Sequence, residues 1–266
     1  MSRLDACFAG LRERGECALI PFVTAGDPDM QTTAQLVPAL AEAGADVIEI
    51  GVPFSDPMAE GPTIQRSSER ALAGGATLRR VFEMIAELRA HVATPIVLMG
   101  YANAFLCNGE ASFAEAAAAA GVDGVICVDL PPEEGESYRA ALAAAGVDSI
   151  LLASPTTSSE RLAMLAEQTR GFLYYVSLTG VTGARSELAA GIEAPVRRAR
   201  EDHGVPVCVG FGVSKPEHAA RIAAFADGVV VGSALVERVA AAPSRDTAVD
   251  AAVRFVAELK EALRPR

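Results

Sequence analysis

The sequence contains no tryptophan and few aromatic residues, which make up 5% of its 266 positions. No metal-ligand spacing connects its three histidines, so we expect no metal site at His91, His203 or His218. The five cysteines form no closely spaced pair, which argues against a disulfide framework built from Cys7, Cys17, Cys107, Cys127 and Cys208. No apolar run reaches the ~18 residues that a membrane span needs, and no signal peptide is visible at the N-terminus. These absences together predict a cytoplasmic location.

Basic residues are also scarce: the chain has 23 lysines and arginines and 34 acidic residues, which gives a net charge of −11. That balance argues against nucleic acid or an anionic membrane as a partner. It also means that overall charge would not steer an anionic substrate toward this protein. Any phosphate group must therefore be held locally, by backbone N–H groups and helix dipoles.

Apolar residues are plentiful, at 51% of the chain, and they recur in eight short runs that start near Ala18, Asp46, Pro95, Val122, Asp148, Phe172, Val205 and Gly228. Helical segments rich in Ala, Leu, Glu and Arg follow most of these runs, for example Thr32–Ala43, Leu78–His91, Ser112–Ala120, Glu134–Ala145 and Ser159–Gln168. Strands that alternate with helices indicate a parallel sheet, and eight such units predict a closed (β/α)8 TIM barrel. An open doubly wound sheet is the structural alternative. No linker divides the chain, so we predict one domain, 1–266, with an N-terminal helix and a short helix, 235–240, after the eighth strand.

The stretch from Ile48 to Pro62 is the most informative part of the sequence. Glu49 lies in an apolar run that reads as a buried strand, where alternation places it on one face with Val47. A carboxylate in such a run is unfavourable unless it is paired or functional. A second carboxylate, Glu60, follows on a loop rich in Gly and Pro, and two acids placed in this way suit proton-transfer chemistry.

Glycine turns close the seventh and eighth strands, at Gly210-Phe211-Gly212-Val213-Ser214 and at Val231-Gly232-Ser233-Ala234. Glycine allows the backbone to approach phosphate oxygens closely, and the loops after strands seven and eight are the usual phosphate site of a barrel. The loop 177–186 is also small, polar and glycine-rich, which is typical either of a mobile lid over a substrate or of a passive flexible loop.

These motifs closely resemble those of the tryptophan synthase alpha chain family, and the likeness covers nearly the whole chain. It includes the segment 21–28, the motif from Ile48 through Gln65, Tyr101-Ala102-Asn103, Gly180-Val181-Thr182-Gly183 and both glycine turns. The resemblance implies retro-aldol cleavage of indole-3-glycerol phosphate to indole and glyceraldehyde 3-phosphate. It implies no cofactor on this chain, and a beta chain carrying pyridoxal phosphate as the partner in an assembly of two alpha and two beta chains.

The resemblance also implies residue roles. Glu49 would be the catalytic acid and base, and Glu60 the second catalytic carboxylate. The indole and glycerol pocket would be lined by Phe22, Met99, Tyr101, Cys127 and Tyr174. Phosphate would contact Gly183, Phe211, Gly212, Val213, Gly232 and Ser233. Thr182 would hydrogen-bond Glu60 when the lid closes, and Pro53 and Asp56 would contact the beta chain.

One position departs from the family pattern, because the family usually has aspartate where this chain has Glu60. The acid function is kept on an arm one methylene longer. Three alternative functions stay open at this point: a freestanding indole-3-glycerol phosphate lyase, a weakly catalytic subunit that activates the beta chain, and another phosphate-binding barrel such as a sugar-phosphate isomerase.

Overall fold

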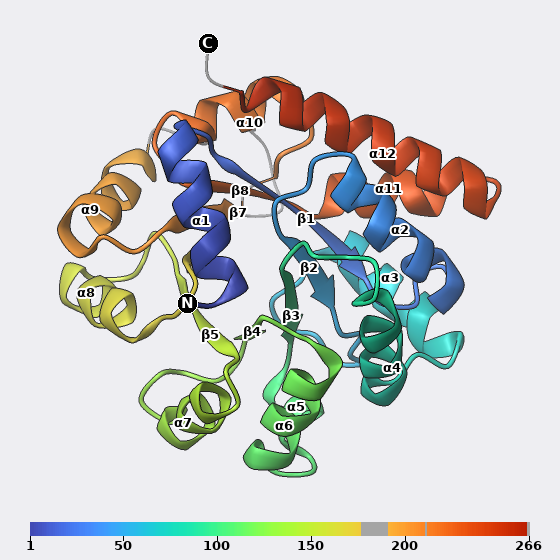
Figure 1. Cartoon of the computed structure of the whole chain (residues 1–266), viewed down its shortest axis with the longest axis horizontal. Helices are drawn as coiled ribbons and strands as arrows, with labels where there is room; N and C mark the ends of the chain where they lie inside the picture. The colour runs from blue at the N-terminus through green and yellow to red at the C-terminus, as the bar shows by residue number, and fades with distance from the viewer. Residues whose placement is uncertain (177–190, 211, 265–266) are drawn as a thin grey trace.

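Eight parallel strands form a closed barrel in the computed structural model, which describes residues 1–176, 191–210 and 212–264 (Figure 1). The strands pair in sequence order and the eighth pairs with the first. Their bounds are β1 Ala18–Thr24, β2 Ile48–Gly51, β3 Ile96–Gly100, β4 Gly124–Cys127, β5 Asp148–Ala153, β6 Leu173–Val176, β7 Val207–Gly210 and β8 Gly228–Val231. The predicted barrel is therefore confirmed, and the open sheet is excluded.

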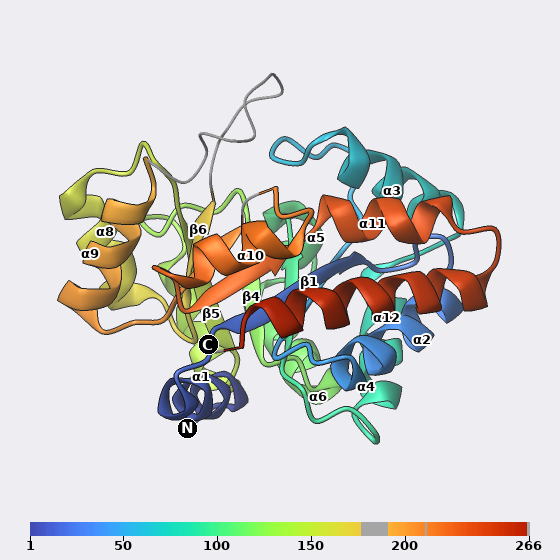
Figure 2. The same ribbon diagram turned by 90° about the horizontal axis from the view of Figure 1, so that it is seen from above.

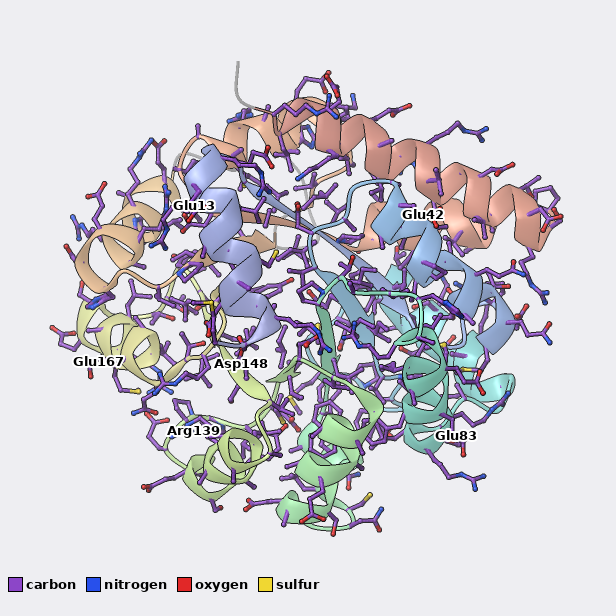
Figure 3. The ribbon with its side chains drawn as sticks, in the orientation of Figure 1. Glu13, Glu42, Glu83, Arg139, Asp148 and Glu167 are labelled. Atoms are coloured by element: carbon purple, nitrogen blue, oxygen red, sulfur yellow. The ribbon has the colours of Figure 1, made fainter. Side chains whose placement is uncertain are left out.

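Helices surround the barrel, and the described ones are α1 Arg3–Arg14, α2 Met30–Glu42, α3 Pro62–Ala73, α4 Leu78–Leu88, α5 Ala102–Leu106, α6 Glu110–Ala120, α7 Glu136–Ala144, α8 Ser159–Gln168, α9 Glu193–His203, α10 Pro216–Ala223, α11 Ser233–Ala241 and α12 Arg245–Ala262. The predicted helix Ser159–Gln168 has the observed bounds, and the helix after the last strand is longer than predicted. Figure 3 shows the charged side chains on the outside of this ring, for example Glu13, Glu42 and Glu83. None of the described helices is both long and apolar enough for a membrane span.

Alternation along each strand divides the apolar side chains between two clusters. The outer cluster lies between sheet and helices and includes Ile48 and Ile50 of β2. The inner cluster fills the barrel and includes Val47, Val97 and Ile126. Glu49 lies between Ile48 and Ile50 in the strand, so it shares the inner face with Val47, as predicted.

Helix α1 closes the end of the barrel where the strands begin (Figure 2). It starts at a capping box in which the Ser2 and Asp5 side chains each bond the other's backbone N–H. Its apolar side chains join the inner cluster, and the ring of Phe8 lies 5.7 Å from that of Phe172. With this end covered, the opposite end, where the strands finish, remains for a site.

Three strands start two residues later than the sequence pattern predicts, at Ile48, Gly124 and Val207. The residues before two of them, Asp46 and Asp123, use their side chains to accept backbone N–H groups of the neighbouring strands. These aspartates bond the neighbouring strand through their side chains. They therefore precede the regular backbone hydrogen bonding of the sheet instead of taking part in it.

Candidate active site

Glu49 is the most unusual ionisable group in the barrel. It is 1% exposed, and its register partners are Phe22 on β1 and Val97 on β3. Its Oε2 atom is buried and has no hydrogen-bond partner among the residues that the structure describes. Burial raises the pKa of this carboxyl from 4.5 to about 8. Glu49 is therefore protonated near neutral pH and can give a proton to a substrate in the barrel mouth.

The ring of Phe22 lies above Glu49 on the inner face, in a position that two glycines permit. A Cβ atom at Gly51 would lie 2.4 Å from the Phe22 Cζ atom, so only glycine fits beneath the ring. A Cβ at Gly232 would lie 3.7 Å from the Phe22 Cβ. The Phe22 side chain thus lies between Glu49 and the glycine turn after β8.

Tyr174 lies on the inner face of β6 and fills the space above a third glycine. A Cβ atom at Gly210 would lie 2.4 Å from the Tyr174 hydroxyl oxygen. Met99 also packs against the inner cluster, and the negative charge of Glu49 contributes to raising the pKa of Tyr174 after burial. The structure therefore brings Glu49, Phe22, Met99 and Tyr174 together inside the barrel, and their contact with a substrate stays a prediction.

Cys127 is a correction to the predicted pocket. It packs against the outer cluster and its thiol donates to Asp129 Oδ1 at 3.7 Å. Its neighbour Ile126 belongs to the inner cluster. Because side chains alternate along β4, Ile126 takes the inward position that the sequence analysis gave to Cys127.

Glu60 lies on the loop between β2 and α3, next to Tyr101 at the end of β3. The Tyr101 hydroxyl donates to Glu60 Oε2 and accepts the backbone N–H groups of Met58 at 3.1 Å and Ala59 at 3.0 Å. Burial raises the pKa of Glu60, and the hydrogen bond from Tyr101 opposes that rise. The structure therefore assigns Tyr101 a contact with Glu60 that the sequence analysis did not predict.

The turns predicted to hold phosphate leave backbone groups available. Gly212 has φ +41°, and a Cβ atom there would have no neighbour within 4 Å among the described residues. Gly232 is the N-cap of α11 and, having no side chain, gives no side-chain hydrogen bond to the first N–H groups of that helix. Val213 is 3% exposed. Thr182, Gly183 and Phe211 lie outside the described residues.

Two buried contacts missed by the sequence analysis connect the loop after β1 with α3. Arg70 donates two hydrogen bonds to the Asp27 carboxylate, at 2.7 and 2.8 Å, and Asp27 is 4% exposed. The hydroxyl groups of Thr24 and Ser67 lie 2.7 Å apart. Since α3 directly follows the Glu60 loop, these contacts fix the base of that loop. Sequence spacing alone gives no signal for such pairs.

The predicted partner-contact residues differ in exposure. Pro53 is buried within the chain, whereas Asp56 is exposed on the same loop. Met58 is 78% exposed, which is unusual for a large apolar side chain in this protein. The exposed surface of the loop is therefore formed by Ser55, Asp56, Met58 and Ala59, while Pro53 is buried.

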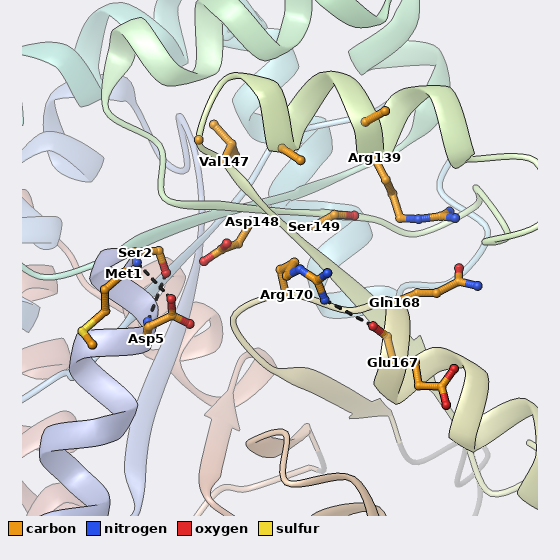
Figure 4. Close-up of a pocket in the computed structure, with 13 residues that line it drawn as sticks. Met1, Ser2, Asp5, Arg139, Val147, Asp148, Ser149, Glu167, Gln168 and Arg170 are labelled. Atoms are coloured by element: carbon orange, nitrogen blue, oxygen red, sulfur yellow. Dashed lines mark hydrogen bonds between the residues drawn. The ribbon is translucent and has the colours of Figure 1, made fainter.

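A cavity of about 630 Å³ lies at the opposite end of the barrel, far from Glu49 (Figure 4). Charges of both signs line it, including Asp148, Arg139 and Arg170. Arg139 donates to the Pro132 carbonyl, and Arg170 to the Glu167 and Thr169 carbonyls. These guanidinium groups already bind the backbone, and we assign the cavity no part in catalysis. Across the described residues no cluster of metal-ligating side chains occurs.

A closed barrel of eight parallel strands with a buried carboxyl on its inner face defines a class, the TIM barrels, whose enzymes have their active sites where the strands finish. Comparison with known families then gives the particular one. The profile described as Tryptophan synthase alpha chain matches residues 8–264, so the chain belongs to the tryptophan synthase alpha chain family. Its role is therefore that of a lyase alpha subunit in tryptophan biosynthesis.

Individual relatives agree with this assignment. The tryptophan synthase alpha chain of Geobacter sulfurreducens is 52% identical, with 99% of each chain covered. The alpha chain of Xanthomonas euvesicatoria is 54% identical, also over 99% of each chain. The crystal structure of the Legionella pneumophila alpha chain superposes with a TM-score of 0.90 at 39% identity, covering 99% of this chain and 97% of that one.

Proposed function

We propose that this chain cleaves indole-3-glycerol phosphate into indole and glyceraldehyde 3-phosphate by a retro-aldol reaction. The observation that carries the proposal is the state of Glu49, a buried carboxyl with an unpartnered oxygen and a pKa of about 8. The reaction needs an acid that first protonates the indole carbon bearing the side chain. A protonated carboxyl in an apolar barrel mouth is suited to that step.

Both proton transfers can use Glu49. Once the ring carbon is protonated, the resulting Glu49 carboxylate removes the proton of the adjacent side-chain hydroxyl. The carbon–carbon bond then breaks, its electrons return to the indole ring, and an aldehyde leaves. Glu49 ends as it began, so the step needs no net proton and no cofactor on this chain.

Glu60 acts on the indole nitrogen, which becomes positive while the ring carbon is protonated. A carboxylate that accepts the ring N–H stabilises this charge. Thr182 is expected to hold Glu60 toward the nitrogen. Phosphate is expected to bind the N–H groups of Gly212, Val213, Gly232 and Ser233, with Gly183 and Phe211 nearby.

The proposed partner is a beta chain that carries pyridoxal phosphate and receives the indole. A solved relative, tryptophan synthase from Mycobacterium tuberculosis in an aminoacrylate-bound form, is 36% identical with a TM-score of 0.89. Two alpha and two beta chains would assemble in the cytoplasm through the loops after β2 and β6. Asp56 contributes an exposed contact, and Pro53 shapes the loop that carries it.

The test is indole release from indole-3-glycerol phosphate by the purified chain, alone and with a cognate beta chain. We expect slow release alone and a marked increase with the partner. Fast release without any partner effect would favour the freestanding lyase. Beta-chain activation that survives loss of both carboxylates would favour the weakly catalytic subunit, and cleavage of other sugar phosphates instead would end the proposal.

A further inference from the structure

The Tyr101 hydroxyl group has an unusual set of neighbours. A phenol oxygen has two lone pairs and one proton. The N–H groups of Met58 and Ala59 use both lone pairs, at 3.1 and 3.0 Å. The single proton must then go to an acceptor, and the Glu60 Oε2 atom is the one it meets. The backbone of the Glu60 loop therefore determines the direction of the Tyr101 hydroxyl proton.

The Tyr101 ring cannot easily turn away from this arrangement. The residue is 2% exposed, and its ring stacks on Phe54 at 5.0 Å between centroids and 25° between planes. Its backbone carbonyl accepts the Phe105 N–H at 3.1 Å in the first turn of α5. Tyr101 is thus a fixed donor, whereas the Glu60 side chain has more freedom.

We propose that Tyr101 is a positioning residue that sets both the direction and the charge of the Glu60 carboxylate. This inference rests on the proposed function, in which Glu60 must be ionised to stabilise the indole nitrogen. It also explains how the longer Glu60 side chain is accommodated, because its carboxylate is held at a hydroxyl that the loop backbone fixes.

Electrostatics around Glu60 agree with this role. Burial favours the neutral acid and Asp129, after β4, adds a like charge, so both raise the pKa of Glu60. Tyr101 and the backbone amides of Ala59 and Glu60 lower it. Asp129 is itself held by the Ala102 N–H at 2.7 Å and stays close to the site. Without the Tyr101 hydroxyl, burial and the charge of Asp129 should raise the pKa of Glu60 further.

The test begins with Tyr101→Phe, which keeps the ring stacking and removes only the oxygen. Tyr138→Phe is the matched control, because its hydroxyl is buried without a partner among the described residues and its ring packs against Phe113 in the outer cluster. For Tyr101→Phe we expect kcat to fall about 10–100-fold, the effect of losing one hydrogen bond to a charged group, with a smaller change in KM. The acid limb of the kcat/KM profile should move to higher pH, and Tyr138→Phe should leave both unchanged.

A double-mutant cycle separates positioning from direct substrate contact. If Tyr101 acts through Glu60, adding Tyr101→Phe to Glu60→Ala should reduce the residual single-turnover rate no further. A further loss as large as that in the wild-type background would overturn the inference. Replacing Tyr101 with 3-fluorotyrosine, a stronger donor of nearly the same size, should move the acid limb to lower pH.

Carboxyl-carbon NMR titration of Glu60 gives a readout that needs no turnover. The pKa of Glu60 should be higher in Tyr101→Phe than in the wild type, and an unchanged pKa would overturn the inference. If the wild type cleaves the substrate and Tyr101→Phe cleaves it equally well, the inference about Tyr101 is rejected while the proposed function stands. A wild type that releases no indole even with a beta chain would reject the proposed function, while the NMR result would still report on the Tyr101–Glu60 pair.

Discussion

Three aspartates that anchor strand starts and the two glutamates of the candidate site have opposite environments. At the end where strands begin, Asp46, Asp123 and Asp227 each accept a backbone N–H from a neighbouring strand, at 2.7, 2.8 and 2.9 Å. Each also forms an ion pair: Asp46 with Lys260, Asp123 with Arg89, and Asp227 with Arg200. At the end where strands finish, Glu49 has an unpartnered oxygen, and the side-chain donor to Glu60 is a neutral tyrosine.

This difference separates structural acids from chemical acids. A carboxylate that accepts N–H groups and pairs with a cation has its oxygens satisfied and stabilises the fold. A carboxyl that is buried without a cation, as Glu49 is, has a raised pKa and can exchange protons. Substitution of one of the three aspartates should therefore change stability with little effect on chemistry, and substitution of either glutamate should do the reverse.

The largest expected effect on rate is at Glu49. Glu49→Gln keeps the shape and removes the exchangeable proton, so indole release should fall about 10²–10⁴-fold. Binding of glycerol phosphate should persist, because the phosphate turns are untouched. Single-turnover indole release and ligand titration measure the two properties. Near-normal cleavage by Glu49→Gln would remove this residue from the mechanism.

Stability should respond to pH through the same residue. The pKa of Glu49 is 4.5 when unfolded and about 8 when folded, so between these values the folded chain binds more protons than the unfolded chain. The free energy of unfolding should therefore fall as pH rises through that window. Glu49→Gln should lose this contribution and be relatively more stable at pH 8 than the wild type. Denaturant unfolding at pH 5 and pH 8 compares them, and an identical pH slope in both proteins would contradict the buried, unpaired state.

Asp123 provides the opposite test at the other end of the barrel. Its side chain is 5% exposed and accepts the Ile96 N–H, and it pairs with Arg89, which is 12% exposed. Asp123→Ala leaves a buried guanidinium group and a strand N–H without their partner, so the free energy of unfolding should fall by about 3–5 kcal/mol. The rate per folded molecule should be nearly unchanged. A variant that keeps its stability but loses its rate would show that the two ends are not separable.

The sequence could predict the barrel because its strands are β-branched runs buried on both faces. Alternation also placed Glu49 correctly on the inner face, since Val47 belongs to the inner cluster. What it could not predict are contacts between distant segments. Tyr101 and Glu60 are 41 positions apart, and Arg70 and Asp27 are 43 apart.

The error at Cys127 has a different origin. Its pocket role came from the resemblance alone, and strand alternation was not applied to β4. The observed clusters place Val125 outside and Ile126 inside, so Cys127 falls on the outer side. If the alternation of side chains had been applied to β4 in its observed register, Ile126 would have been selected as the pocket residue in place of Cys127.

Gly212 tests the part of the site that holds no acid. Its φ of +41° suits glycine, and no atom of the described part of the chain would lie within 4 Å of a Cβ atom there. In Gly212→Val the new side chain should occupy space that the phosphate needs, and the dissociation constant for glycerol phosphate should rise at least about tenfold. Gly204→Val is the matched control, because Gly204 has φ +67°, also lacks neighbours, and ends α9. Equal binding by both variants would place the phosphate site elsewhere.

The smallest expected effect is at Glu60, where the acid can be shortened without being removed. Glu60→Asp withdraws the carboxylate by up to roughly 1.5 Å, about one carbon–carbon bond. Misplacement of this size can reduce a rate by about 10²-fold, but only if the loop cannot follow. Because the Tyr101 hydroxyl is fixed, the exposed loop around Glu60 must move toward it, and we expect this small shift to keep the shorter carboxylate within reach. We therefore expect Glu60→Asp to be neutral or mildly slower in indole release, and Glu60→Ala to be severely slower. A rate at least an order of magnitude faster in Glu60→Asp would mean that the long side chain is an uncompensated defect, and would move the balance toward a subunit whose main task is to activate its partner.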